Sequence, residues 1–243
     1  MTKLQSEFER LFLVRPEAAA QPAALIGAAG TVRAMVLELT RTPDWEVLSP
    51  VWRGVQTELE LPAPAIAVSG VDALQLWFSL AQPVEAAQAS GFLEGLRQRF
   101  LPDVDVRRVR MLPAADASAQ AGRVPAVQPD TGNWSAFVAP DLAPVFGETP
   151  WLDIPPNEEG QANLLRAIAS IQPAEFEAAM ARLGARPHVP PAATVTPLPH
   201  RSTPPRGDAA EPRRFLLQVM HDETVAMGLR IEAAKALLQH SGA

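Results

Sequence analysis

A small set of polar and aromatic side chains in the first half of the chain has the composition of a binding or catalytic surface. It combines a carboxylate, a carboxamide, an indole and two guanidinium groups with two hydroxyls. The residues lie in segments where apolar and polar types alternate, which is typical of β-strands. Alternation places the set on one face of a sheet, opposite the face that helices cover. Its members are Glu38, Thr40, Ser69, Gln75, Trp77, Arg108 and Arg110.

Guanidinium groups bind phosphates and an indole stacks on a base, so this face is suited to a single-stranded nucleic acid. The residues that we expect to bind it are Gln75, Trp77, Arg108 and Arg110. A second interpretation stays open. The segment after Ala121 folds over the face, buries it, and leaves the arginines in ion pairs with Glu38 or Asp105.

The elements that position these residues follow the order strand, helix, strand, strand, helix, strand between Thr31 and Pro113. That order predicts an α+β fold, a ferredoxin-like or RRM-like βαββαβ sandwich. A short amphipathic helix before it repeats Leu4, Phe8, Leu11 and Phe12 at helical spacing, and we expect it to pack on the sandwich. The expected strands span 32–40, 65–69, 73–80 and 104–112. One helix is expected to begin after Asp44, and a second helix is expected to span 84–100.

The second half of the chain divides by composition. Residues 114–130 predict a loop, 133–138 an edge strand, and 159–171 and 173–183 two helices that form a hairpin on the sandwich. Eight prolines and five arginines between Arg186 and Arg214 indicate an extended basic linker. Two amphipathic helices are expected after it. The predicted divisions are 1–115 (sandwich), 116–185 (wrapping segment), 186–212 (linker) and 213–243 (helix pair).

Composition excludes several classes of site. The 243 residues contain no cysteine, which excludes disulfides, thiolate metal ligands and thiol catalysis. No histidine precedes His188, so a Ser-His-acid triad is not expected in the folded part, and no Gly-rich phosphate loop occurs. A net charge of −6 disfavours a globally basic nucleic-acid binder. Charged residues interrupt the N-terminal segment 1–16, and no run approaches the ~20 apolar residues of a membrane span, so we expect a cytoplasmic protein without a membrane span.

Three short motifs carry a family resemblance. They are Val36-Leu37-Glu38-Leu39-Thr40, then Ser69-Gly70 before Leu74-Gln75-Leu76-Trp77-Phe78, then Val109-Arg110-Met111-Leu112-Pro113. Over about 80 residues the chain resembles the archaeo-eukaryotic primase superfamily, most of all its plasmid and phage replication-primase branch.

The resemblance implies where a catalytic site would lie and also that its catalytic residues have been lost. Family members carry two acidic residues on the first strand, which hold divalent metal, and a histidine after the Ser-Gly turn. Glu38 stands at the first acidic position, Thr40 at the second and Gln75 at the histidine. The resemblance therefore implies a primase-like domain without catalysis or cofactor. The alternative is a magnesium-dependent nucleotidyl transferase with an atypical site on Glu38 and Asp72.

The last 30 residues are similar to a segment of phage terminase small subunits, through Phe215-Leu216-Leu217, Val219-Met220, Asp222, Leu229-Arg230-Ile231 and Ala233-Ala234-Lys235-Ala236. This resemblance implies a mobile-element origin and a helix pair that docks on a protein; an ordinary tail folded on the main domain is the other possibility. The expected contact residues are Phe215, Leu216, Val219, Leu229 and Leu237. The expected function is non-catalytic, DNA-replication-associated binding of a nucleic acid or a protein partner through an open sheet face and the tethered terminal helices.

Overall fold

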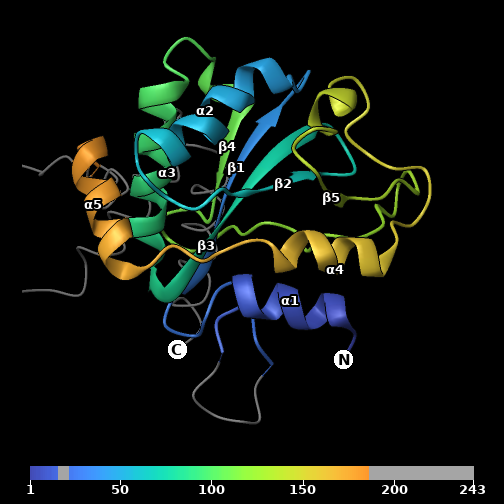
Figure 1. Cartoon of the computed structure of the whole chain (residues 1–243), viewed down its shortest axis with the longest axis horizontal. Coiled ribbons are helices and arrows are strands. Elements are labelled where there is room, and N and C mark those ends of the chain that lie inside the picture. The colour runs from blue at the N-terminus through green and yellow to red at the C-terminus, as the bar shows by residue number, and fades with distance from the viewer. Residues whose placement is uncertain (16–21, 186–243) are drawn as a thin grey trace, which may run out of the picture. The chain divides into compact units, whose positions relative to one another are not determined.

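The computed structural model describes residues 1–15 and 22–185 of the chain (Figure 1). Within them the predicted α+β class is confirmed. Between Thr31 and Leu112 the elements follow the expected order, with one 3-10 turn, η1, before the last strand. Their bounds are β1 Thr31–Thr40, α2 Trp45–Thr57, β2 Ala65–Val68, β3 Ala73–Glu85, α3 Ala86–Phe100, η1 Val106–Arg108 and β4 Val109–Leu112.

The strands form one antiparallel sheet in the order β4-β1-β3-β2-β5. β5 (Ala136–Val138) pairs with β2 and lies at one edge, where the sequence predicted an edge strand. β4 lies at the other edge. The register places Glu38 of β1 directly opposite Gln75 of β3 on one side and Arg110 of β4 on the other. These three residues therefore meet on one face of the sheet.

Helices α2 and α3 cover the first face of the sheet. Their apolar stripes bury the side chains that β1 and β3 turn to this side, among them Leu37, Leu76 and Phe78. α2 starts at its expected cap, because the Asp44 carboxylate accepts a hydrogen bond from the Glu46 backbone N–H at 2.8 Å.

The second face of the sheet is covered too, by α1 (Lys3–Phe12) and α4 (Glu158–Arg166), which lie side by side beneath it (Figure 1). The Arg10 guanidinium of α1 donates to the carbonyl oxygens of Leu165 and Ile168 at the end of α4. The expectation that this face is open is therefore wrong. Alternation correctly predicted that Glu38, Gln75, Trp77 and Arg110 face this side, whereas Ser69 and Arg108 lie in turns outside the strands. It carries no information about which distant segment covers the face.

The expected helical hairpin also needs correction. α5 (Pro173–Leu183) packs on α3, whereas α4 packs on α1 and β5, so the two helices lie on opposite sides of the sheet (Figure 1). The segment that joins them is tied to the edge of β3: the Ile171 N–H donates to the Ser79 carbonyl at 2.8 Å, and the Ala81 N–H donates to the Ile171 carbonyl at 2.9 Å. This pairing holds the connecting segment, which passes from one side of the sheet to the other.

The last strand is shorter than predicted. Residues 104–108 were expected to belong to it, but 106–108 form η1, whose Arg107 N–H is capped by the Asp105 carboxylate at 2.9 Å. Arg108 therefore lies in the turn, where alternation no longer sets the direction of its side chain.

Within the described residues, the expected segments 1–115 and 116–185 belong to one structural unit. The predicted linker and terminal helices lie outside the described residues. Among the helices of the described part, none has the length and apolar character needed to cross a bilayer.

Candidate functional site

Three predicted site residues form a chain of hydrogen bonds inside the second face. The Trp77 indole N–H donates to the Gln75 Oε1 at 2.8 Å, and the Gln75 Nε2 donates to the Glu38 Oε1 at 2.6 Å. All three side chains are buried. The sequence thus correctly predicted that they share a face. The structure adds that each side chain is a hydrogen-bond partner of the next.

This row of hydrogen bonds ends at the protein surface with Arg110. Its Nη1 donates to the second carboxylate oxygen of Glu38 at 3.2 Å, and its side chain is 65% exposed while that of Glu38 is 6% exposed. Burial raises the pKa of the Glu38 carboxyl above its ordinary value, against the opposing effects of the Arg110 charge and the Gln75 hydrogen bond. This ion pair is the one that the covered-face interpretation predicted.

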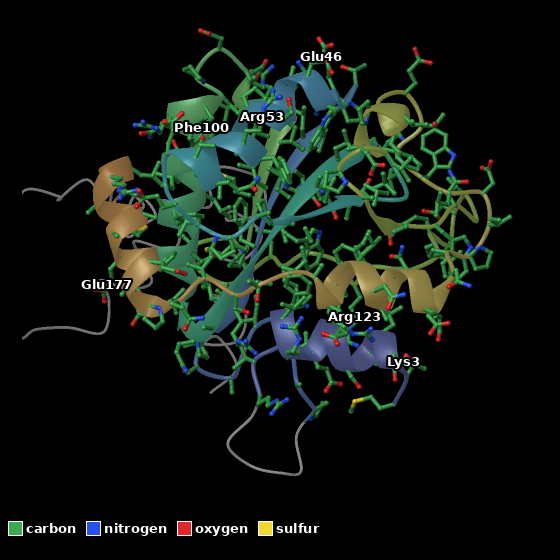
Figure 2. The ribbon with its side chains drawn as sticks, in the orientation of Figure 1. Lys3, Glu46, Arg53, Phe100, Arg123 and Glu177 are labelled. Atoms are coloured by element: carbon green, nitrogen blue, oxygen red, sulfur yellow. The ribbon has the colours of Figure 1, made fainter. Side chains whose placement is uncertain are left out.

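Trp77 is a core residue, not an accessible platform. It is 0% exposed, and its ring lies 5.9, 5.1 and 5.9 Å from the rings of Phe8, Phe12 and Phe137. The segment after Ala121 adds to the cover, with Val124 buried in the same cluster and the Arg123 guanidinium 6.0 Å from the Phe8 ring beside α1 (Figure 2). In this structure neither Trp77 nor Gln75 is accessible to a base.

The magnesium site of the alternative function, on Glu38 and Asp72, does not fit these residues. One Glu38 oxygen accepts from Gln75 and the other from Arg110, so both already have donors. Thr40, at the second acidic position, donates its hydroxyl to the Arg108 carbonyl at 3.3 Å. Asp72 is near enough to influence Glu38 electrostatically, but the described residues contain no group of three carboxylates or histidines arranged to hold a metal.

A surface hollow of about 760 Å³ opens beyond this end of the sheet. Gly70, in the turn between β2 and β3, donates its N–H to the Pro150 carbonyl at 3.0 Å and so joins two of its walls. Arg108 reaches the hollow: its Nη2 donates to the Thr42 carbonyl at 2.9 Å, and its Nε is buried without a hydrogen-bond partner. The polar and aromatic lining consists of Thr42, Asp44, Asp72, Arg108, Glu148 and Trp151.

The charge of this hollow disfavours a phosphate ligand. Three carboxylates line it against one guanidinium, and phosphate groups would be repelled by that excess.

The two edges of the sheet differ in their backbone hydrogen bonds. At β5 the Gln161 carboxamide satisfies both outward groups of Phe137: the Phe137 N–H donates to Oε1 at 2.7 Å and Nε2 donates to the Phe137 carbonyl at 2.8 Å. A side-chain amide thus occupies the place of a further strand.

At β4 no comparable cap is present in the described part of the chain. The Val109 N–H turns away from β1 and donates to the Val106 carbonyl. Since direction alternates along an antiparallel pair, Met111, two residues on, also turns its N–H and C=O outward. Neither group has a hydrogen-bond partner among the described residues. The Arg110 side chain lies next to this free edge, on the second face.

The chain was compared with protein-family models and with curated proteins, and it matches none of them. Its functional assignment therefore depends on the geometry above.

The sequence analysis missed three residues that the structure makes prominent. They are Gln161, which caps β5, Met111, whose backbone groups face the free edge of β4, and Trp151, which lines the surface hollow. None of them was among the predicted site residues. The predicted partner-binding residues of the tail, Phe215, Leu216, Val219, Leu229 and Leu237, lie outside the described residues.

Proposed function

We propose that this protein is a non-enzymatic binding module whose partner is a protein segment that adds a strand to the edge of the sheet at β4. Strand addition uses main-chain hydrogen bonds for affinity and neighbouring side chains for specificity. Arg110, one of the residues expected to bind a ligand, keeps a binding role in this proposal. Gln75 and Trp77 support it from within the core.

The observation that carries the proposal is the difference between the two edges. An exposed edge strand is a template for pairing with another chain, and proteins commonly block such edges. Gln161 blocks the β5 edge, with both of its hydrogen bonds shorter than 3 Å. The Met111 N–H and C=O have no such block within the described residues, which makes the β4 edge the one available for pairing.

Charge favours a protein partner over a nucleic acid. Residues 1–185 contain 14 lysines and arginines against 22 aspartates and glutamates, a net charge of −8. Such a domain repels a polyanion, and binding to nucleic acid needs contacts that release counterions. The mobile-element origin and the docking role of residues 213–243 remain predictions from sequence.

Amide hydrogen exchange on the full chain, followed by NMR, tests the proposal directly. We expect the Met111 amide to exchange fast and the Arg110 amide, which pairs with β1, to exchange slowly. A neutral β-forming probe peptide, acetyl-Thr-Val-Thr-Val-Thr-Val-amide, should slow exchange at Met111. A protected Met111 amide in the free protein, or no protection at saturating peptide, would contradict strand addition.

The matched variant is Met111→Pro, which removes the outward N–H and leaves the bonds of Arg110 to β1 in place. It should bind the fluorescein-labelled probe about 5- to 10-fold more weakly, as expected for one lost hydrogen bond. Met111→Leu, which retains the N–H, serves as the control and should bind like the parent. Salt-sensitive binding of a single-stranded oligonucleotide that abolishes peptide binding would instead support the nucleic-acid alternative.

A further inference from the structure

We infer that the strand added at β4 runs antiparallel to it and places an acidic side chain opposite Arg110, directly after an apolar side chain opposite Met111. This inference rests on the proposed function and specifies the partner of the same site. It depends on the register of β4, on the faces of its side chains and on the charges along the edge.

The register follows from the outward backbone groups. An antiparallel partner residue opposite Met111 exchanges two hydrogen bonds with it, and the residue opposite Val109 donates a third to the Val109 carbonyl. The Val109 N–H is already used by the Val106 carbonyl, so pairing ends there. The free edge is therefore short, and side chains must supply much of the specificity.

The faces of the partner side chains follow from the pleat. Met111 packs on the first face, against the core beneath α2 and α3, whereas Arg110 lies on the second face beside Glu38. A partner residue opposite Met111 extends the apolar surface of the first face. Its neighbour in sequence points to the second face, next to the Arg110 guanidinium.

Charge along the edge favours an acid at that position. The Arg110 side chain is 65% exposed, and among the described residues its carboxylate partner is the buried Glu38, on the side of β1. Arg107 is exposed three residues earlier, and the nearest carboxylate in sequence, Asp105, caps its backbone N–H. A guanidinium that is 65% exposed can bind a second carboxylate on an added strand, whereas a lysine there would be repelled.

Direction sets the order of the two partner residues. In an antiparallel pair the residue after the one opposite Met111 meets Arg110, and in a parallel pair the residue before it does. All four pairs of named strands in the described part of the chain are antiparallel, and the single-residue bridge of Ile171 to Leu80 is parallel. The sequence of the partner strand therefore has an apolar residue followed directly by an acidic residue.

Three labelled peptides of matched length test this: Thr-Thr-Val-Glu-Thr-Thr, the reversed order Thr-Thr-Glu-Val-Thr-Thr, and Thr-Thr-Val-Lys-Thr-Thr. Measured by fluorescence anisotropy on the full chain, the first should bind about fivefold more tightly than the second and about tenfold more tightly than the third. Arg110→Ala should remove the preference for glutamate over lysine, and Arg110→Lys should restore part of it. Arg166→Ala, on α4 near the opposite edge, is the control and should leave all three affinities unchanged.

The outcomes separate this inference from the proposed function. Equal binding of the glutamate and lysine peptides, with Met111 protected from exchange by both, would overturn the acidic partner and leave strand addition standing. Preference for the reversed peptide would overturn the antiparallel direction. Failure of every peptide to protect Met111 would overturn both proposals. The NMR spectrum of Arg110→Ala shows whether that variant keeps the parent fold.

Discussion

The carboxamide of Gln161 pairs with both backbone groups of Phe137, as a neighbouring strand would, with donor–acceptor distances of 2.7 and 2.8 Å. Both residues are buried, so water cannot replace either bond. The pairing also fixes α4 against β5, and through α1 it helps to keep the second face covered.

Gln161→Leu should therefore destabilise the fold strongly. The leucine fills similar space but leaves the Phe137 N–H and C=O buried without partners, at a cost of about 2–4 kcal/mol in the free energy of unfolding. Urea denaturation followed by circular dichroism measures it. Asn163→Ala, at an exposed position of the same helix, should change stability by less than about 0.5 kcal/mol. A Gln161→Leu variant as stable as the parent would refute the structural role of this pairing.

Trp77→Phe isolates the polar part of the buried chain. The phenyl ring can keep contact with Phe8, Phe12 and Phe137, but the Gln75 Oε1 loses its donor. We expect a loss of about 1–3 kcal/mol, the usual cost of a buried acceptor left unpaired plus some packing loss. Trp151→Phe, at a half-buried indole, should cost clearly less. Similar losses for the two variants would show that the Trp77–Gln75 bond contributes little.

Glu38→Gln should change how stability depends on pH. Because burial raises the pKa of Glu38 above its ordinary value of 4.5, the folded state holds this proton to higher pH than the unfolded state does. The contribution of Glu38 to the free energy of unfolding is therefore fully present below that ordinary value and falls as pH rises through the folded-state pKa. The Glu38→Gln variant has no titrating group at this position, so its free energy of unfolding lacks this decrease.

The measurement is urea denaturation of both proteins at several pH values from 4 to 8. Stability of Glu38→Gln relative to the parent should increase with pH across the window that begins near 4.5. A relative stability that is constant, or that decreases with pH, would show that the Arg110 ion pair outweighs burial and that the pKa of Glu38 is not raised.

Gly54→Ala should be destabilising although alanine favours helices. A Cβ at residue 54 of α2 would overlap Cε1 of Phe100, the last residue of α3. We expect this overlap to lower the free energy of unfolding by about 1–3 kcal/mol. The higher helix propensity of alanine offsets about 1 kcal/mol of that loss. In a Phe100→Ala background the same substitution should become neutral or stabilising.

A four-member double-mutant cycle in urea measures that coupling. Gly160→Ala in α4 is the matched control, since its Cβ would have ordinary contacts only, 3.6 Å from Oδ1 of Asn157. It should stabilise the protein by up to about 1 kcal/mol. Additive effects of Gly54→Ala and Phe100→Ala would indicate that the two helices are not packed as closely as described.

Local patterns in the sequence were sufficient for the element order, the α+β class and the face on which Glu38, Gln75 and Arg110 meet. Each depends on periodicity, caps and turns, which act over a few residues. Asp44, for example, caps the helix that it was expected to start. The sequence also indicated β5 at a sheet edge and α1 as a helix that packs on the sheet.

Only the tertiary structure decided whether the polar set is exposed, which edge of the sheet is open and on which sides α4 and α5 lie. Trp77 is buried because Phe8, Phe12 and Phe137, from segments far apart in the chain, converge on it. Gln161 caps Phe137 from 24 residues away. Such contacts depend on how apolar faces from distant segments fill shared space, and a periodic pattern specifies that a face is buried without specifying what buries it.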